Sequence, residues 1–216
     1  LSLHDALPIF LIILALTPIS IYSSSRLLVS SQHQKIFLRQ FNLGDYSTPS
    51  LEVIDKFEMK HKNLSATTLP MSTIKGLYYL NNDKFREAVP LFKKGIEANP
   101  YLFISESFLG FTYNVLKMPD SALYYTKKAF DNMPKNSIHY ANYVNSLVQM
   151  KDSITIKNVY QSIEVVDPNR DPIYDQVYLL AMAEITDPDN TDFTLSDIDI
   201  DFQSGNDRLK KGYYTL

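Results

Sequence analysis

Two stretches of the sequence decide the fold: GLYYLNNDKFREAVPLFKKGIEANP at residues 76–100 and GFTYNVLKMPDSALYYTKKAFDNMP at residues 110–134. They align when one is shifted by the distance along the chain from Gly76 to Gly110, which we call the repeat period. The positions that share this register are Gly76 and Gly110, Ala88 and Ala122, and Pro100, Pro134 and Pro168. A fixed period of about 34 residues is typical of a helical repeat array.

The spacing predicts two helices in each unit. In the first unit we expect them at residues 69–82 and 85–98. The small residues Gly76 and Ala88 are predicted to let these two helices approach closely. Pro100 is predicted to end the second helix, because proline lacks an amide hydrogen and biases the preceding residue towards extended backbone.

This pattern resembles the tetratricopeptide repeat, a helix–turn–helix unit of about 34 residues. The resemblance covers residues 69–102 and 103–136, and it extends in a degenerate form to residues 137–170, where Val144 and Ile156 replace the small residues. It implies an all-α chain whose helical hairpins stack into a right-handed solenoid.

The segment 171–216 is expected to be a partial unit. Residues 173–185 are mostly apolar and contain neither glycine nor proline, so they predict one more helix. Residues 186–204 are rich in aspartate and predict a loop or an extended segment. The last residues, LKKGYYTL at 209–216, resemble IKGLYYL at 74–80, and they predict a further helix that is truncated.

The N-terminal part predicts a membrane helix. No residue from Ala6 to Ser25 is charged, and this run is long enough to cross a hydrocarbon core of about 30 Å. We assign the span to residues 10–25 and interpret residues 1–9, LSLHDALPI, as a non-native leader that resembles a translated sequencing adapter. A signal peptide and a buried core helix are the alternative interpretations.

Residues 26–68 are interpreted as a linker followed by a capping hairpin. Amphipathic patterns predict helices at residues 30–43 and 51–61, with a turn at Gly44 between them. A degenerate repeat is the alternative. The cap is favoured because no small residue occupies the contact positions.

The composition argues against several kinds of chemistry. The 216 residues include no cysteine and carry a net charge of -3, so thiolate sites are excluded and nucleic acid is not an expected partner. The four histidines lack metal-ligand spacing, and the six glycines are too dispersed for a phosphate loop. The run 197–201 begins like a calcium loop, but Phe202 and Arg208 stand where an EF-hand needs Gly and Glu. We therefore expect no catalytic residue, no metal and no cofactor.

The resemblance implies a binding groove on the concave face, lined by the first helix of each unit. The residues at the corresponding positions are Thr73, Leu77, Asn81, Ser107, Phe111, Asn114, Asn145 and Gln149. Further positions of the same kind are Leu80, Ile104, Val115, Ile138, Ala141, Val148, Asp175, Leu179 and Met182. Relatives that bind the acidic C-termini of heat-shock chaperones use Lys and Arg in this groove, and this sequence has neither there, so we reject that partner. We expect instead a peptide or protein segment with apolar side chains, or another part of the same protein.

The expected function is a non-catalytic, membrane-anchored scaffold that binds a protein partner. The order of span, hairpin and repeats also resembles the C-terminal region of bacterial O-antigen ligase or polymerase-like membrane proteins. In that case the catalytic part would precede this chain, and none of its residues would carry the reaction. A secreted or lipoprotein-like repeat protein is a third interpretation.

Overall fold

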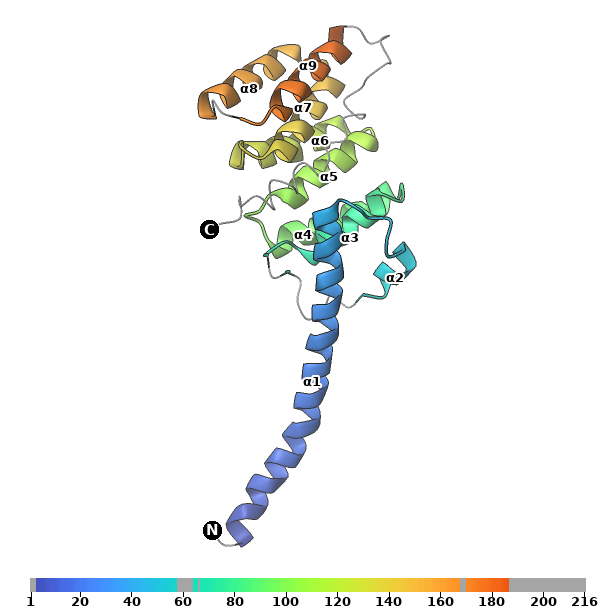
Figure 1. The fold of residues 1–216 in the computed structure, drawn as a ribbon, viewed down its shortest axis with the longest axis vertical. Helices are drawn as coiled ribbons and strands as arrows, with labels where there is room; N and C mark the ends of the chain where they lie inside the picture. The colour runs from blue at the N-terminus through green and yellow to red at the C-terminus, as the bar shows by residue number, and fades with distance from the viewer. Residues whose placement is uncertain (1–2, 58–63, 66, 168–169, 187–216) are drawn as a thin grey trace.

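The computed structural model describes residues 3–57, 64–65, 67–167 and 170–186, with side chains from Phe10 onwards. In this part of the chain every assigned element is an α-helix and there is no strand. One isolated β-bridge joins Leu64 to Pro70. Figure 1 shows one long helix leading into a stack of shorter ones. The predicted Asp-rich loop, the truncated terminal helix and Pro168 lie outside the described residues.

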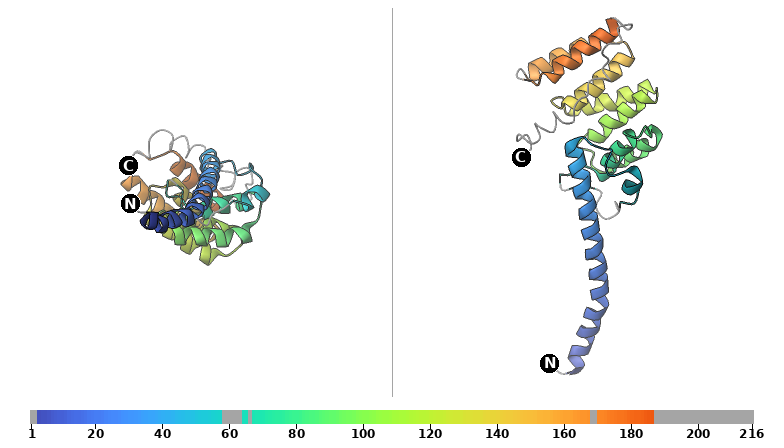
Figure 2. Two further views of the ribbon diagram at one scale, coloured as in Figure 1. Left: turned by 90° about the horizontal axis from the view of Figure 1, so that it is seen from below. Right: turned by 45° about the vertical axis from the view of Figure 1, so that its right-hand side comes forward.

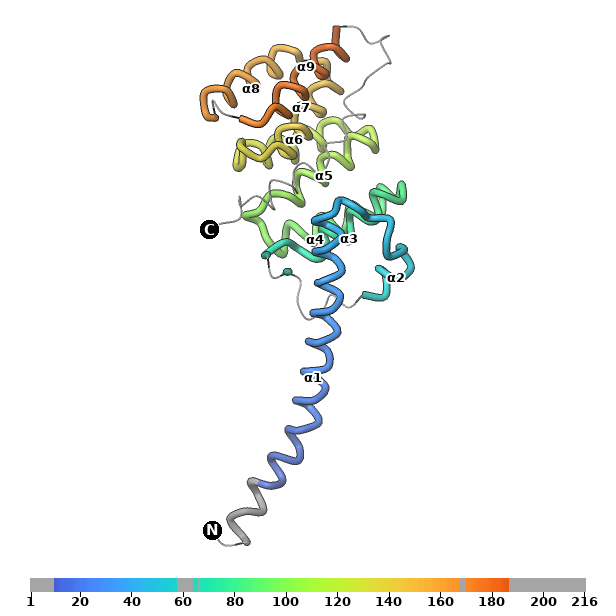
Figure 3. The backbone as a smooth tube through the Cα atoms, in the orientation of Figure 1, coloured from blue at the N-terminus to red at the C-terminus, as the bar shows by residue number. Residues whose placement is uncertain are grey.

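Helix α1 (Leu3–Leu43) is continuous, as the tube in Figure 3 also shows. The predicted span at 10–25 and the predicted helix at 30–43 are therefore parts of one helix, and the expected linker between them is helical too. The reason is local, because neither glycine nor proline occurs between Ile19 and Leu43. Gly44 then ends the helix with a φ of 67°, in the left-handed region that glycine adopts without a steric penalty.

Among the described residues, the stretch Phe10–Leu43 is the one helical segment long and apolar enough to cross a membrane. None of the most apolar part of this segment is buried against the rest of the protein. Side chains such as Leu14, Ile19 and Ile21 are more than half exposed. A signal sequence near an N-terminus has the same properties.

The remaining helices form pairs that pack on one another in chain order (Figure 1). Helix α2 (Leu51–Asp55) is shorter than predicted and contacts the first pair. The pairs are α3 (Met71–Leu80) with α4 (Phe85–Ala98), α5 (Ile104–Val115) with α6 (Pro119–Asn132), and α7 (Ser137–Gln149) with α8 (Ser153–Val166). Helix α9 (Ile173–Thr186) packs on both α7 and α8.

The turn inside each pair has the same backbone geometry, and this geometry recurs at the repeat period. Asp83, Lys117 and Lys151 each have a φ of 57°, in the left-handed region. The amide of the next residue donates to a carbonyl five residues earlier, as from Lys84 to Tyr79 at 2.9 Å. The same bond runs from Met118 to Tyr113 and from Asp152 to Leu147, which makes each turn a helix C-cap of the Schellman type.

The second helix of each pair ends at the residue position that the sequence analysis predicted from the prolines. Asn99, Met133 and Asp167 directly precede Pro100, Pro134 and Pro168, and their φ angles are -148°, -138° and -142°. A residue before proline is pushed out of the helical region by the proline ring. The helices end before Pro100 and Pro134 as predicted, and α8 ends at Val166, while Pro168 lies outside the described residues.

The glycines of the repeat register lie where two helices touch. A Cβ added to Gly110 would lie 2.4 Å from the Thr126 Cγ2 atom and 3.0 Å from the carbonyl oxygen of Ala122. A Cβ at Gly76 would lie 2.7 Å from the ring of Phe92. Ala88 and Ala122 are fully buried. The small residues therefore permit close approach of the paired helices, as predicted.

We predict that Gly110→Ala lowers the free energy of unfolding by about 1–3 kcal/mol, because the added methyl meets the backbone of α6 and overpacks the contact. Urea unfolding followed by circular dichroism measures the change. The matched control is Ser121→Ala, at a half-buried helical position whose side chain is shortened instead. A Gly110→Ala protein as stable as the parent would contradict the close contact.

Candidate functional site

Four of the eight residues predicted to line the groove are buried. They are Thr73, Leu77, Ser107 and Asn114. Leu77 belongs to the hydrophobic core that also contains Tyr78. These side chains face neighbouring helices of the array, and the resemblance alone did not distinguish them from exposed ones.

The three buried polar members join the first helix of one unit to the first helix of the next. The Thr73 Oγ1 lies 2.6 Å from the Ser105 Oγ. The Asn142 Nδ2 donates to the Ser107 Oγ at 2.9 Å. In the same way the Asn114 Nδ2 donates to the Ser146 Oγ at 2.9 Å, so these hydrogen bonds stabilise the stacking of units.

The other four predicted residues are exposed or half-buried: Asn81, Phe111, Asn145 and Gln149. Two positions of the unit are exposed or half-buried in consecutive units, except that Leu77, which is in register with Phe111 in the first unit, is buried. One row contains Asn81, Val115 and Gln149, and the other contains Phe111, Asn145 and Leu179, each at steps of one repeat period. Leu179 on α9 is 64% exposed. We call the surface formed by Asn81, Phe111, Val115, Asn145, Gln149 and Leu179 the exposed strip.

The exposed strip carries no formal charge. The charged residues of α3, α5 and α7 are Lys75 and Glu106. The Lys75 Nζ lies 2.9 Å from the Asp55 carboxylate. Glu106 is fully buried, and its carboxylate lies 3.1 Å from the Lys128 Nζ on α6. Neither charge is free to meet a ligand on the strip.

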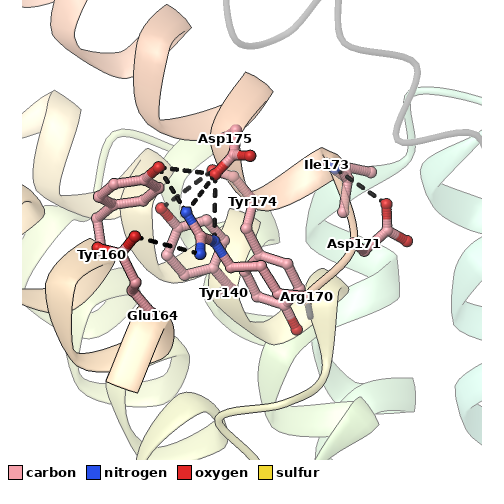
Figure 4. A network of polar contacts seen from close by, with 8 residues as sticks. All are labelled: Tyr140, Tyr160, Glu164, Arg170, Asp171, Ile173, Tyr174 and Asp175. Atoms are coloured by element: carbon pink, nitrogen blue, oxygen red, sulfur yellow. Dashed lines mark hydrogen bonds and ion pairs between the residues drawn. The ribbon is translucent and has the colours of Figure 1, made fainter. Parts of the chain in front are cut away.

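On the last helix, the predicted groove residue Asp175 takes part in a polar network instead (Figure 4). Its carboxylate accepts hydrogen bonds from the Tyr160 hydroxyl at 2.7 Å and from the Arg170 guanidinium at 2.6 Å. The hydrogen bond from Tyr160, together with Arg170, holds the pKa of Asp175 below its usual range. Arg170 also lies over the ring of Tyr160, 4.9 Å from its centroid. The network ties α9 to α8.

The described residues contain no group of three or more His, Asp or Glu side chains that could hold a metal ion. A shallow depression of about 380 Å³ lies beside the α5–α6 turn, lined by Arg86, Val89, Tyr113, Leu116 and Met118. None of these residues belongs to the exposed strip.

His139 is fully buried at the start of α7. Burial lowers the pKa of its imidazole from 6.5 to about 4, despite a backbone interaction with Leu102 that acts in the opposite direction. The imidazole is therefore neutral at physiological pH.

No family model matches the chain, and a comparison with curated proteins finds none that is similar.

The buried imidazole predicts a pH dependence of stability. The unfolded chain binds a proton at His139 near pH 6.5 and the folded chain near pH 4. The contribution of the neutral His139 side chain to the free energy of unfolding is complete above pH 6.5. It falls as the pH drops towards 4 and changes no further below that. The total loss is about 3 kcal/mol.

Unfolding free energies measured between pH 7 and pH 4 test this, with His139→Leu as the control that removes the titrating group. The difference between the two proteins should change over that window. Parallel curves would show that His139 does not titrate differently on folding.

Proposed function

We propose that the chain is a membrane-anchored scaffold of the tetratricopeptide type that binds a segment of another protein on the exposed strip. Three features that recur at the repeat period support the repeat family: the glycine contacts, the left-handed turns at Asp83, Lys117 and Lys151, and the non-helical residues that end the second helices. These are backbone features, independent of the groove residues.

The anchor in this proposal is the segment Phe10–Ser25 of α1. Its side chains are apolar and exposed in the structure, which is costly in water and favourable in hydrocarbon. Thr17 and Ser20 donate their hydroxyl hydrogens to the carbonyl oxygens of Ile13 and Leu16, so these polar groups are satisfied within the helix. The proposed location is therefore a membrane.

The observation that carries the binding proposal is the recurrence of uncharged, exposed or half-buried side chains at equivalent positions, in the row Asn81, Val115 and Gln149 and in the row Phe111, Asn145 and Leu179. Phe111, Val115 and Leu179 offer apolar contact area. Asn145 and Gln149 offer amides that can both donate to and accept from a peptide backbone. This chemistry suits a protein segment with apolar side chains. It does not suit nucleic acid or an acidic chaperone C-terminus, which require cations.

A second candidate is the C-terminal repeat region of an O-antigen ligase or polymerase-like membrane enzyme. It is favoured by one observation, that the helix containing the apolar segment continues to Leu43 and contacts α3 of the first unit. The gene upstream of Phe10 distinguishes the two. Several further apolar segments there would support the enzyme, and a start codon with a short basic segment would support a single anchor or a signal peptide.

We predict that the full chain sediments with membranes and resists extraction by alkaline carbonate, because a helical span is held by its buried apolar surface. Cell fractionation followed by immunoblotting measures this. The control is a chain that begins at Leu64, without α1 and α2. Recovery of the full chain in the soluble fraction would contradict the anchor.

For the strip, we predict that Phe111→Ala and Asn145→Ala each weaken capture of the partner about fivefold or more, as expected of central contact residues. Quantitative pull-down from detergent extracts of membranes measures the loss. The matched controls are Tyr124→Ala and Asn158→Ala, which truncate exposed residues on α6 and α8. If the strip and control variants capture the partner equally well, the binding surface lies elsewhere.

A further inference from the structure

The membrane segment and the repeat array are joined by a helix without a break. Helix α1 continues from Arg26, which ends the uncharged run, to Leu43. At a rise of about 1.5 Å per residue this part is about 26 Å long. Ser30 in this part is only 1% exposed, and the ring of Phe37 packs on Tyr78 of α3. From Arg26 to Phe37 the helix rises by about 17 Å, or roughly three turns.

Aromatic side chains hold the upper part of α1 against the first unit. Phe37 is fully buried, and its ring lies 6.0 Å from Tyr78 on α3 and 5.2 Å from Phe57. Tyr46, in the loop after α1, lies 5.4 Å from Tyr78. Edge-on aromatic contacts of this kind are directional, so they restrict rotation of α1 relative to α3.

The loop after α1 adds polar contacts to the same joint. The Tyr78 hydroxyl donates to the carbonyl oxygen of Thr48 at 3.2 Å, and the Gln40 side chain donates to the same oxygen. Because Gln40 lies on α1 and Tyr78 on α3, one backbone group connects the two helices. The joint is thus packed and hydrogen-bonded on one face of α1.

The helices stack along a line that continues α1. Figure 1 shows the pairs arranged from α3 and α4 beside the end of α1 to α8 and α9 at the far end, and the second view in Figure 2 shows the same order. Seen from below, α1 overlies the helices stacked behind it (Figure 2). The line along which units repeat is therefore close to the direction of α1.

We propose that α1 and the first unit form a rigid pillar that holds the array upright on the membrane, and that the exposed strip thereby receives an extramembrane segment of a second protein anchored in the same membrane. The inference rests on the proposed anchoring by α1. An upright array presents α5, α7 and α9 at increasing heights above the bilayer, with the strip running along the membrane normal. A segment that continues a neighbouring transmembrane helix leaves the bilayer in that same direction.

Charge and confinement favour this partner over a lipid surface or a soluble acidic protein. The strip has no cation to attract phosphate headgroups, and most of it lies on α5, α7 and α9, beyond the first unit. Two proteins held in one membrane also meet at a high effective concentration, so a modest uncharged surface is sufficient for binding.

The height of the array is measurable without knowing the partner. The chain has no cysteine, so Lys94→Cys on α4, Tyr124→Cys on α6 and Lys157→Cys on α8 each allow one donor dye at an exposed site. With the full chain in phosphatidylcholine vesicles that contain acceptor-labelled headgroups, energy transfer should fall in that order. Inserting seven helix-forming residues after Arg26 should raise every label by about 10 Å. The matched control inserts seven glycine and serine residues, which should remove the ordered increase.

Equal energy transfer from the three sites, or no shift on the helical insertion, would overturn the upright pillar. A chain that does not enter the vesicles would instead overturn the anchoring on which it rests, so the two failures are distinguishable.

The partner is tested with a photo-crosslinking residue placed at Val115 or Leu179 of the full chain in native membranes, and at Tyr124 as the control. We expect a crosslinked species from the two strip positions. After the crosslinker is cleaved, the released partner should itself resist carbonate extraction. A partner released by carbonate, crosslinking equal to that from Tyr124, or no crosslinked species would overturn the assignment of a membrane-anchored partner.

Discussion

The fold depends on the close approach of the two helices within each pair. At Gly110 the space for a side chain is already occupied by Thr126 and by the backbone of α6. Only a residue without Cβ fits there, which sets the distance between α5 and α6. Once the paired helices are this close, the intervening turn must be short. The left-handed residue at Lys117 provides it by capping α5 and reversing the chain.

Stacking of the pairs brings a second constraint, the satisfaction of polar groups between consecutive first helices. Thr73, Ser107 and Asn114 are small or amide side chains that find partners on the next unit. A buried polar group without a partner costs about 1–3 kcal/mol, so these pairings also favour one register of stacking. The positions that remain uncovered form the exposed strip, and the packing of the array thereby determines where a ligand is able to bind.

Much of the helical organisation could be predicted, because glycine and proline act locally. The helix at 85–98 and the ends before Pro100 and Pro134 were predicted correctly. The left-handed turns were not identified, because Asp83, Lys117 and Lys151 are not glycines and their conformation is imposed by the helices on either side. The continuation of the helix from the apolar segment to Leu43 was not predicted, since an amphipathic pattern does not show whether it continues a preceding helix. Asp175 was placed in the groove, yet Arg170 and Tyr160 engage it, through a contact between helices that periodicity does not encode.

The sequence by itself determined the all-α character, the repeat period and an apolar segment long enough for a membrane, because spacing, small residues and hydropathy are properties of the chain alone. Only the tertiary structure decided which polar residues are used in stacking and which remain on the surface. It also decided that α1 enters the first unit as one helix, with Phe37 packed against Tyr78. The physical reason is that burial and hydrogen-bond partners depend on residues from neighbouring units, and these are brought together only when the pairs stack.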